Sequence, residues 1–320
     1  MPRQGLDRTA RLRRTSVGLV AVAALLAVML VWLTHGGGGG EPQAFGHQTA
    51  DSPSTTAPAK VTTTTAGAPP STASPSAGDP LGAAAQSLID GRQGTIEVAA
   101  YDLDTAQTWT LGGSTPQDEA SVVKVDILEA LLAQSKGQGL ASAEQPVAQS
   151  MIEESDNDSA TDLWDDAGAA SGIGSFDASA GLTNTTPSQC VECPGFPWPG
   201  WGLTTTTPSD QITLLRMLVQ ANNLLTAPER QYALGLMENV TSSEQWGVTG
   251  GVPAGVTVAL KNGWLPLNAA DTDWQINSVG WVSGGGRNYL LAVLTTGDPS
   301  EQYGIDTIDD LSGMVWNALG

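Results

Sequence analysis

The chain has 320 residues, 40% of them apolar, and a formal net charge of −20 at pH 7. After residue 79 it carries 29 acidic and 7 basic side chains, a net charge of −22. Nucleic acid and anionic lipid are therefore disfavoured as partners of this region, because both are polyanions. The same region has no histidine, and the chain has two cysteines, so neither a Ser-His-Asp triad nor a zinc hydrolase centre is expected. We predict no metal and no cofactor.

Residues 1–35 are predicted to form a basic cytoplasmic stub and a transmembrane signal anchor. An uncharged apolar run at 17–33 follows five arginines. Its length is about the minimum for a helix that spans a bilayer, and the preceding arginines place the N-terminus in the cytoplasm. A cleaved signal peptide is the alternative, but no small-x-small cleavage site follows the run. We expect a single-pass protein of the cell membrane, with the remaining chain extracytoplasmic.

Residues 36–79 are predicted to be a disordered linker, because they are rich in Gly, Pro, Ser and Thr and lack apolar periodicity. Residues 80–320 are predicted to form one α/β domain of the α+β type, and we expect a monomer. In chain order, the predicted elements are strands at 94–103 and 107–111; helices at 121–134, 144–154, 210–222 (capped by Thr207) and 228–240; strands at 256–261, 275–282 and 289–295; and a helix at 305–319. Strands at both ends predict an antiparallel sheet built from the two termini and flanked by helices.

The chemistry of the domain is predicted to rest on a Ser-Lys pair. Ser121-Val122-Val123-Lys124 has the S-x-x-K form, and residues three apart share one face of a helix. Without histidine, Lys124 is the candidate to activate Ser121 as a nucleophile. Free backbone N–H groups at the helix N-terminus favour a developing anion beside Ser121. The structural alternative is a plain helix cap followed by a solvated lysine.

Two further motifs follow Ser121 and Lys124 in the order typical of serine hydrolases that use a Ser-Lys pair. In Ser155-Asp156-Asn157, Ser155 is the candidate to pass a proton to a leaving nitrogen, and Asn157 to bind a substrate amide. In Lys261-Asn262-Gly263, Lys261 is the candidate to hold a substrate carboxylate, and Gly263 allows close approach to the strand. The structural alternatives are an acidic helix cap and an ordinary edge-strand lysine.

These motifs make residues 94–297 resemble the class A β-lactamases and related penicillin-recognising serine hydrolases, most closely the exported actinobacterial members. The segments that carry the resemblance include SVVKVDILEALL, ESDNDSATDLW, GLTTTTPSD and ALKNGW. The resemblance implies a β-lactamase-like fold, an acyl-enzyme on Ser121, and substrate contacts from Asn157 and Lys261. Asn262, Gly263 and Trp264 are further predicted substrate-binding residues. It also implies an oxyanion hole formed by the backbone N–H groups of Ser121 and Trp264.

The segment before the Thr-rich run departs from the family pattern. Its one carboxylate, Glu192, is the candidate deacylation base, but its surroundings do not match the family loop. Glu192 lies between Cys190 and Cys193, which are expected to form a disulfide in an exported domain. The substrate is predicted to be a β-lactam. The alternatives are a D-Ala-D-Ala carboxypeptidase or transpeptidase acting on peptidoglycan peptides, and a protein that binds β-lactams or wall peptides but acylates slowly or not at all.

Overall fold

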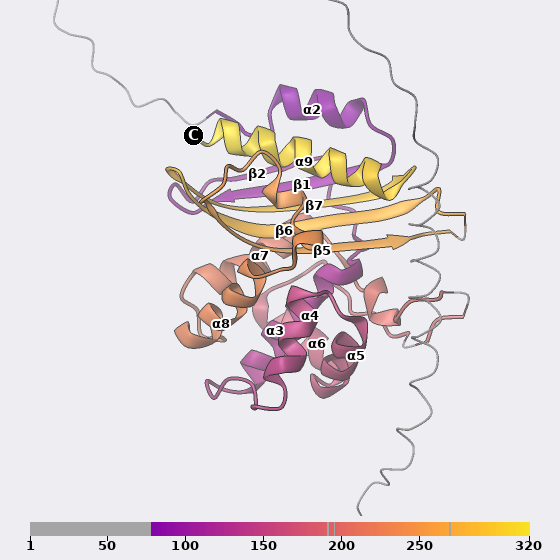
Figure 1. The fold of residues 1–320 in the computed structure, drawn as a ribbon, viewed down its shortest axis with the longest axis vertical. Coiled ribbons are helices and arrows are strands. Elements are labelled where there is room, and N and C mark those ends of the chain that lie inside the picture. Colours follow the sequence, from indigo (N-terminus) through magenta and orange to yellow (C-terminus); the bar gives the residue numbers. More distant parts are fainter. Residues whose placement is uncertain (1–77, 191, 195, 269) are drawn as a thin grey trace, which may run out of the picture. The chain divides into compact units, whose positions relative to one another are not determined.

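The computed structural model describes residues 78–190, 192–194, 196–268 and 270–320 (Figure 1). The predicted signal anchor, and the predicted linker up to residue 77, lie outside the described residues. Within the described part of the chain, no helix combines the length and apolar character needed to cross a membrane.

A five-stranded antiparallel sheet organises the domain, with strand order β2-β1-β7-β6-β5. The strands are β1 (Thr95–Asp102), β2 (Thr108–Leu111), β5 (Thr257–Pro266), β6 (Trp274–Gly284) and β7 (Arg287–Asp298). The N-terminal hairpin joins the C-terminal strands where β1 pairs with β7, with Val98 opposite Val293. This confirms the predicted sheet built from both ends of the domain. A separate two-stranded ladder joins β3 (Gln117–Asp118) to β4 (Thr205–Thr206).

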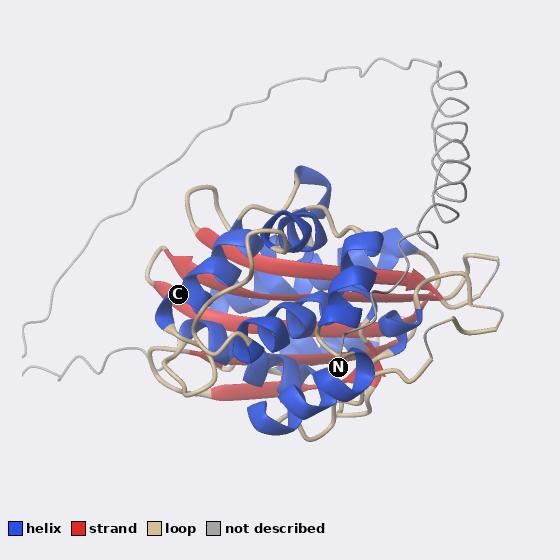
Figure 2. Cartoon of the chain, turned by 90° about the horizontal axis from the view of Figure 1, so that it is seen from below, coloured by secondary structure: helices blue, strands red, loops and turns tan. Residues whose placement is uncertain are grey.

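Helices cover both faces of the sheet (Figures 1 and 2). One face carries α2 (Ala83–Asp90) and α9 (Glu301–Ala318). The other carries α3 (Val123–Gln134), α4 (Gln145–Glu153), α5 (Asn157–Asp166), α6 (Ala169–Ala180), α7 (Pro208–Val219) and α8 (Ala227–Glu238). Short 3₁₀ turns complete the connections: η2 (Ala120–Val122), η3 (Gly200–Leu203), η4 (Ser242–Glu244) and η5 (Gly247–Thr249).

Successive residues of the strands pack alternately into two separate hydrophobic cores, one on each face of the sheet. In β7, Leu290 and Ala292 join the core that includes α3 and α7, while Leu291 and Val293 join the core that includes α9. Successive side chains of a strand point to opposite faces, so a sheet covered on both sides must be apolar at nearly every position. This explains why the strands of the sheet show long buried runs rather than clean alternation.

The structure also contains elements that the sequence did not predict. Helices α2, α5 and α6 were missed, and α6 (AASGIGSFDASA) is rich in Gly and Ser, which are weak helix formers. Buried Ile173 and Phe176 hold it in the core. Strand β5 was predicted to end at Lys261, but it continues to Pro266 because β6 pairs along its whole length. The predicted cap of α7 is confirmed, since the Thr207 hydroxyl accepts a hydrogen bond from the Asp210 N–H.

Four buried carboxyl groups in and around α3 have raised pKa values. Glu119 precedes η2, Asp126 and Glu129 lie in α3, and Asp177 lies in α6. Burial is the main cause that raises the pKa of Asp126 to about 7 and that of Asp177 to about 8. It also raises the pKa values of Glu119 and Glu129 well above their usual range. None of the ion pairs among the described residues involves these groups. They therefore hold protons in the folded state that they release on unfolding.

We expect the domain to lose stability as the pH rises from 5 to 8. A carboxyl group with a raised pKa binds more protons folded than unfolded, so its contribution is complete below the unfolded pKa and is lost towards the folded pKa. Each extra proton held by the folded state costs about 1.4 kcal/mol of unfolding free energy per pH unit across that window. Chemical denaturation at several pH values measures the slope. Asp177→Asn should flatten it, while the same change at exposed Asp165 should not; stability that rises with pH would contradict this account.

Candidate active site

The 3₁₀ turn η2 places Ser121 immediately before α3, against the edge strand β5. Ala120, the residue before it, has a left-handed φ of +49°, which sets the turn. A β-carbon on Gly263 would lie 2.7 Å from the Ser121 nitrogen and 2.8 Å from the Glu119 carbonyl oxygen, so only glycine allows this approach. From β6, the Asn277 side-chain amide donates to the carbonyls of Asp118 and Glu119, at 2.9 Å each. The sheet thus fixes the backbone around Ser121.

Lys124 is fully buried, and its ammonium nitrogen is the centre of the site. Nζ lies 3.0 Å from the Ser121 Oγ, 3.1 Å from the Ser155 Oγ, 2.6 Å from the Ser155 carbonyl oxygen and 2.8 Å from the Asn157 Oδ1. The predicted i, i+3 contact between Ser121 and Lys124 is therefore present. An ammonium has three hydrogens for these four neighbours, whereas a neutral amine has a lone pair that accepts a hydroxyl proton.

Ser155 joins the two lysines. Its hydroxyl accepts from Lys124 and also from the Lys261 Nζ, at 2.9 Å. Ser155 lies between α4 and α5 with a φ of +56°, a left-handed conformation that is uncommon for a residue with a β-carbon. The next residue, Asp156, caps α5 by accepting from the Ser159 N–H at 2.7 Å. The cap and the turn hold the Ser155 hydroxyl between residues that are far apart in the sequence.

The two lysines have low pKa values because both are buried. Burial is the largest cause for Lys124, and the charge of Lys261 adds to it, while Glu244 and Asp156 oppose them; the pKa of Lys124 lies well below its usual range. Burial lowers the pKa of Lys261 to about 8, against the opposing charge of Glu244. Burial thus favours the neutral amine of Lys124, which can accept a proton, while Glu244 favours the charged form of Lys261. A neutral lysine suits a proton acceptor, and a charged lysine suits a group that binds a substrate carboxylate.

The Asn262 and Trp264 side chains lie on the other face of β5 from Lys261. Strand alternation puts Lys261 and Gly263 on the α3 side and residues 262 and 264 on the α9 side. Asn262 is fully buried, and its amide donates to the carbonyls of Glu244 and Trp246, at 2.6 and 3.2 Å. The Trp264 indole packs edge-on against Trp246. That Asn262 contacts substrate stays a prediction, and its side-chain amide N–H groups are directed to these two carbonyls. The backbone N–H of Trp264 remains the candidate for the oxyanion hole.

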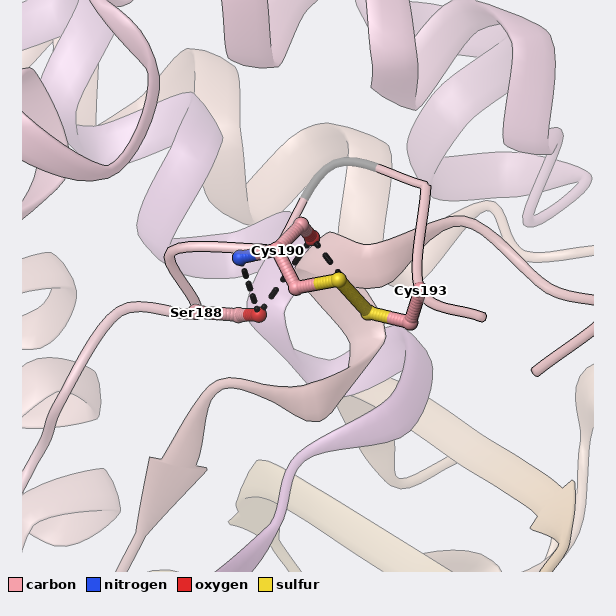
Figure 3. The surroundings of a disulfide bond; sticks show 3 residues. All are labelled: Ser188, Cys190 and Cys193. Carbon is pink, nitrogen blue, oxygen red and sulfur yellow. Dashed lines mark hydrogen bonds between the residues drawn. A yellow bond between two sulfur atoms is a disulfide. The ribbon is translucent and has the colours of Figure 1, made fainter. Parts of the chain in front are cut away.

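Glu192 lies in an exposed loop, and none of the hydrogen bonds or ion pairs among the described residues involves its side chain. Figure 3 shows that the flanking Cys190 and Cys193 are joined by a disulfide. Their Cα atoms are 5.5 Å apart. The Cys190 N–H donates to the Ser188 hydroxyl at 3.3 Å. Glu192 is thus held in a small bridged loop, not among the hydrogen-bonding partners of Lys124.

Two further residues lie close to the lysines, and sequence reasoning assigned neither of them a role in the site. The Trp201 ring lies 5.0 Å from the Lys124 Nζ, and its indole N–H donates to the Thr161 hydroxyl at 3.1 Å. Glu244, in η4, places Oε2 3.9 Å from the Lys261 Nζ. Trp201 stands just before the Thr-rich run, in the stretch predicted to carry the deacylation base. No motif marks Glu244.

Comparison with known proteins places the chain in a family. The profile described as the β-lactamase enzyme family matches residues 136–319. The chain belongs to the β-lactamase enzyme family. The matched segment contains Ser155, Asn157 and Lys261, whereas Ser121 and Lys124 precede it and are joined to the site by the geometry described above. This confirms the resemblance inferred from the motifs, and the chain is a serine hydrolase of the β-lactamase type.

Solved β-lactamases share the fold. The TLA-1 extended-spectrum β-lactamase is 16% identical with a TM-score of 0.66, over 76% of this chain and 99% of that one. A class A β-lactamase from Bacteroides cellulosilyticus is 17% identical with a TM-score of 0.63, over 73% and 95%. A class A β-lactamase from Mycobacterium abscessus is 23% identical with a TM-score of 0.60, over 72% and 96%. At these identities the likeness establishes the fold alone. Comparison with curated protein sequences gave no match.

Proposed function

We propose that the chain is an exported, membrane-anchored hydrolase that opens β-lactams through an acyl-enzyme on Ser121. The observation that carries the proposal is the continuous contact from Ser121 through Lys124 and Ser155 to Lys261, with steps of 2.9 to 3.1 Å between their side-chain atoms. Two hydroxyls and two lysines with lowered pKa values supply a nucleophile, a proton acceptor, a relay and a cation. Family membership supports the same chemistry. The apolar run at 17–33 supports an anchor that leaves the domain extracytoplasmic.

In the proposed reaction, neutral Lys124 takes the Ser121 proton as Oγ attacks the lactam carbonyl carbon. The backbone N–H groups of Ser121 and Trp264 stabilise the oxyanion. The carbon–nitrogen bond then breaks, and the proton reaches the leaving nitrogen through the Ser155 hydroxyl. Charged Lys261 attracts the carboxylate beside that nitrogen. The product of this half-reaction is an ester between Ser121 and the opened ring.

Slow turnover, with the chain acting largely as a β-lactam-binding protein, is the second candidate function. The observation in its favour is the set of Lys124 partners, which comprises two hydroxyls, a carbonyl and a side-chain amide, with no carboxylate among them. A water molecule that attacks the acyl ester needs a general base, and Glu192 is not among these partners.

The pH dependence of acylation tests the proposed roles of the two lysines. We expect the rate of acylation by benzylpenicillin to rise as Lys124 becomes neutral and to fall again near the pKa of Lys261, about 8. The rate should fall at alkaline pH because Lys261 loses the positive charge that attracts the substrate carboxylate. Stopped-flow acylation from pH 5 to 10 measures the profile. A rate that keeps rising through pH 9 would contradict a charged Lys261 as the receptor, and reaction with a D-Ala-D-Ala peptide but not with penicillin would replace the proposed substrate.

A further inference from the structure

Glu244 is a buried carboxylate beside Lys261 that the proposed reaction does not use. Its side chain is 7% exposed, and its Oε2 lies 3.9 Å from the Lys261 Nζ, with no hydrogen-bond partner among the described residues. Its backbone carbonyl accepts from the Asn262 side-chain amide at 2.6 Å. The carboxylate is therefore fixed next to the cation of the site by the strand that carries that cation.

The negative charge of Glu244 partly neutralises the positive charge of Lys261 that a substrate carboxylate would meet. The Lys261 ammonium already donates to the Ser155 hydroxyl and to the Asn262 carbonyl, and Glu244 is its ion-pair partner. Asn262, the neighbouring residue of the motif, directs its amide N–H groups to backbone carbonyls on the other face of β5. An arriving anion thus meets a cation that faces a buried anion, which repels it over a short distance.

We propose that Glu244 determines specificity by weakening the capture of substrates whose leaving side carries a carboxylate, relative to uncharged counterparts. The inference rests on the proposed function, in which Lys261 receives that carboxylate. The strongly acidic domain, with a net charge of −22 after residue 79, adds to the same bias at long range. The site should therefore favour neutral esters and amides over carboxylates. This preference should be stronger than in a site whose lysine has no acidic partner.

The influence of Glu244 extends to the nucleophile. The groups that shift the pKa of Lys124 are burial, the Lys261 charge, and the Glu244 and Asp156 carboxylates, which raise it. Glu301, at the start of α9, is the further charged group that interacts with Glu244. Removing the Glu244 charge should therefore lower the pKa of Lys124. A lower pKa makes the Ser121 proton acceptor available at lower pH, whatever the charge of the substrate.

The first test compares benzylpenicillin with its methyl ester, which lacks the carboxylate charge. Second-order rate constants for acylation of Ser121 are measured at pH 6.5 in the wild type, Glu244→Gln and Asp165→Asn. Asp165 is exposed in α5, so its substitution changes the net charge equally without touching the site. We expect the preference for the acid over the ester to increase by about tenfold in Glu244→Gln, and by less than about twofold in Asp165→Asn. Equal factors for both substrates in Glu244→Gln would overturn the proposal.

The second test uses a fluorophosphonate, which carries no carboxylate, to label Ser121 as a function of pH. On the acidic side of the pH profile, the labelling rate should begin to rise at a lower pH in Glu244→Gln than in the wild type. A rise at the same pH in both proteins overturns the inference. If the fluorophosphonate labels the wild type but neither benzylpenicillin nor its methyl ester reacts, the proposed β-lactam function fails. The pH at which fluorophosphonate labelling begins to rise then decides the role of Glu244. Thermal melts check folding, and Glu244→Ala, which also removes the charge, replaces the glutamine variant if that variant does not fold.

Discussion

Replacement of Lys124 by alanine is expected to slow acylation of Ser121 by about 10²–10⁴-fold, even at saturating substrate, because general-base assistance to the serine is lost. In the structure, the Lys124 Nζ is the basic group within hydrogen-bonding distance of the Ser121 Oγ. Lys261→Ala should act differently and mainly raise the substrate concentration needed for half-maximal acylation. Lys136→Ala removes an exposed lysine and serves as the control. Negligible effects of both active-site substitutions would refute the shared site.

A persistent penicillin adduct is the second large effect that we expect. Without a general base to assist water attack, deacylation should be slower by about 10²–10⁴-fold, so acylation should outpace it. The Trp201 ring centroid lies 5.0 Å from the Lys124 Nζ, and among the described residues no carboxylate is a hydrogen-bonding partner of Lys124. Intact-mass time courses after removal of excess penicillin measure the lifetime of the adduct.

Glu192→Gln should leave that lifetime almost unchanged, because Glu192 is exposed in its disulfide-bridged loop. The opposite result is equally clear. Rapid multiple turnover in the wild type, with the adduct trapped only in Glu192→Gln, would show that this loop supplies the deacylation base. The chain would then be an efficient β-lactamase.

The parts of the site that depend on local geometry could be predicted from the sequence. The spacing of Ser121 and Lys124 places them together on any helix, and this contact is present at 3.0 Å. The approach of Lys261 to Ser155 could not be derived from spacing, because it depends on how β5 packs against the loop before α5. The resemblance to a known family, rather than periodicity, led to that expectation.

Other features escaped prediction for physical reasons. The period of two in a strand puts the Asn262 side chain on the other face of β5 from Lys261, which the motif taken as a unit did not distinguish. Glu244 reaches Lys261 from a 3₁₀ turn of three residues, whose position depends on tertiary packing. Helix α6 is held by buried contacts that override its weak intrinsic propensity. Each omission reflects long-range packing that no single segment encodes.

The central claim is that Ser121 forms the acyl-enzyme with β-lactams, and mass spectrometry of the purified domain after reaction with benzylpenicillin tests it most directly. The account predicts that the intact mass increases by one penicillin per chain, that peptide mapping places the adduct on Ser121, and that Ser121→Ala shows no increase. An adduct that persists in Ser121→Ala, or that maps to another serine, would contradict it.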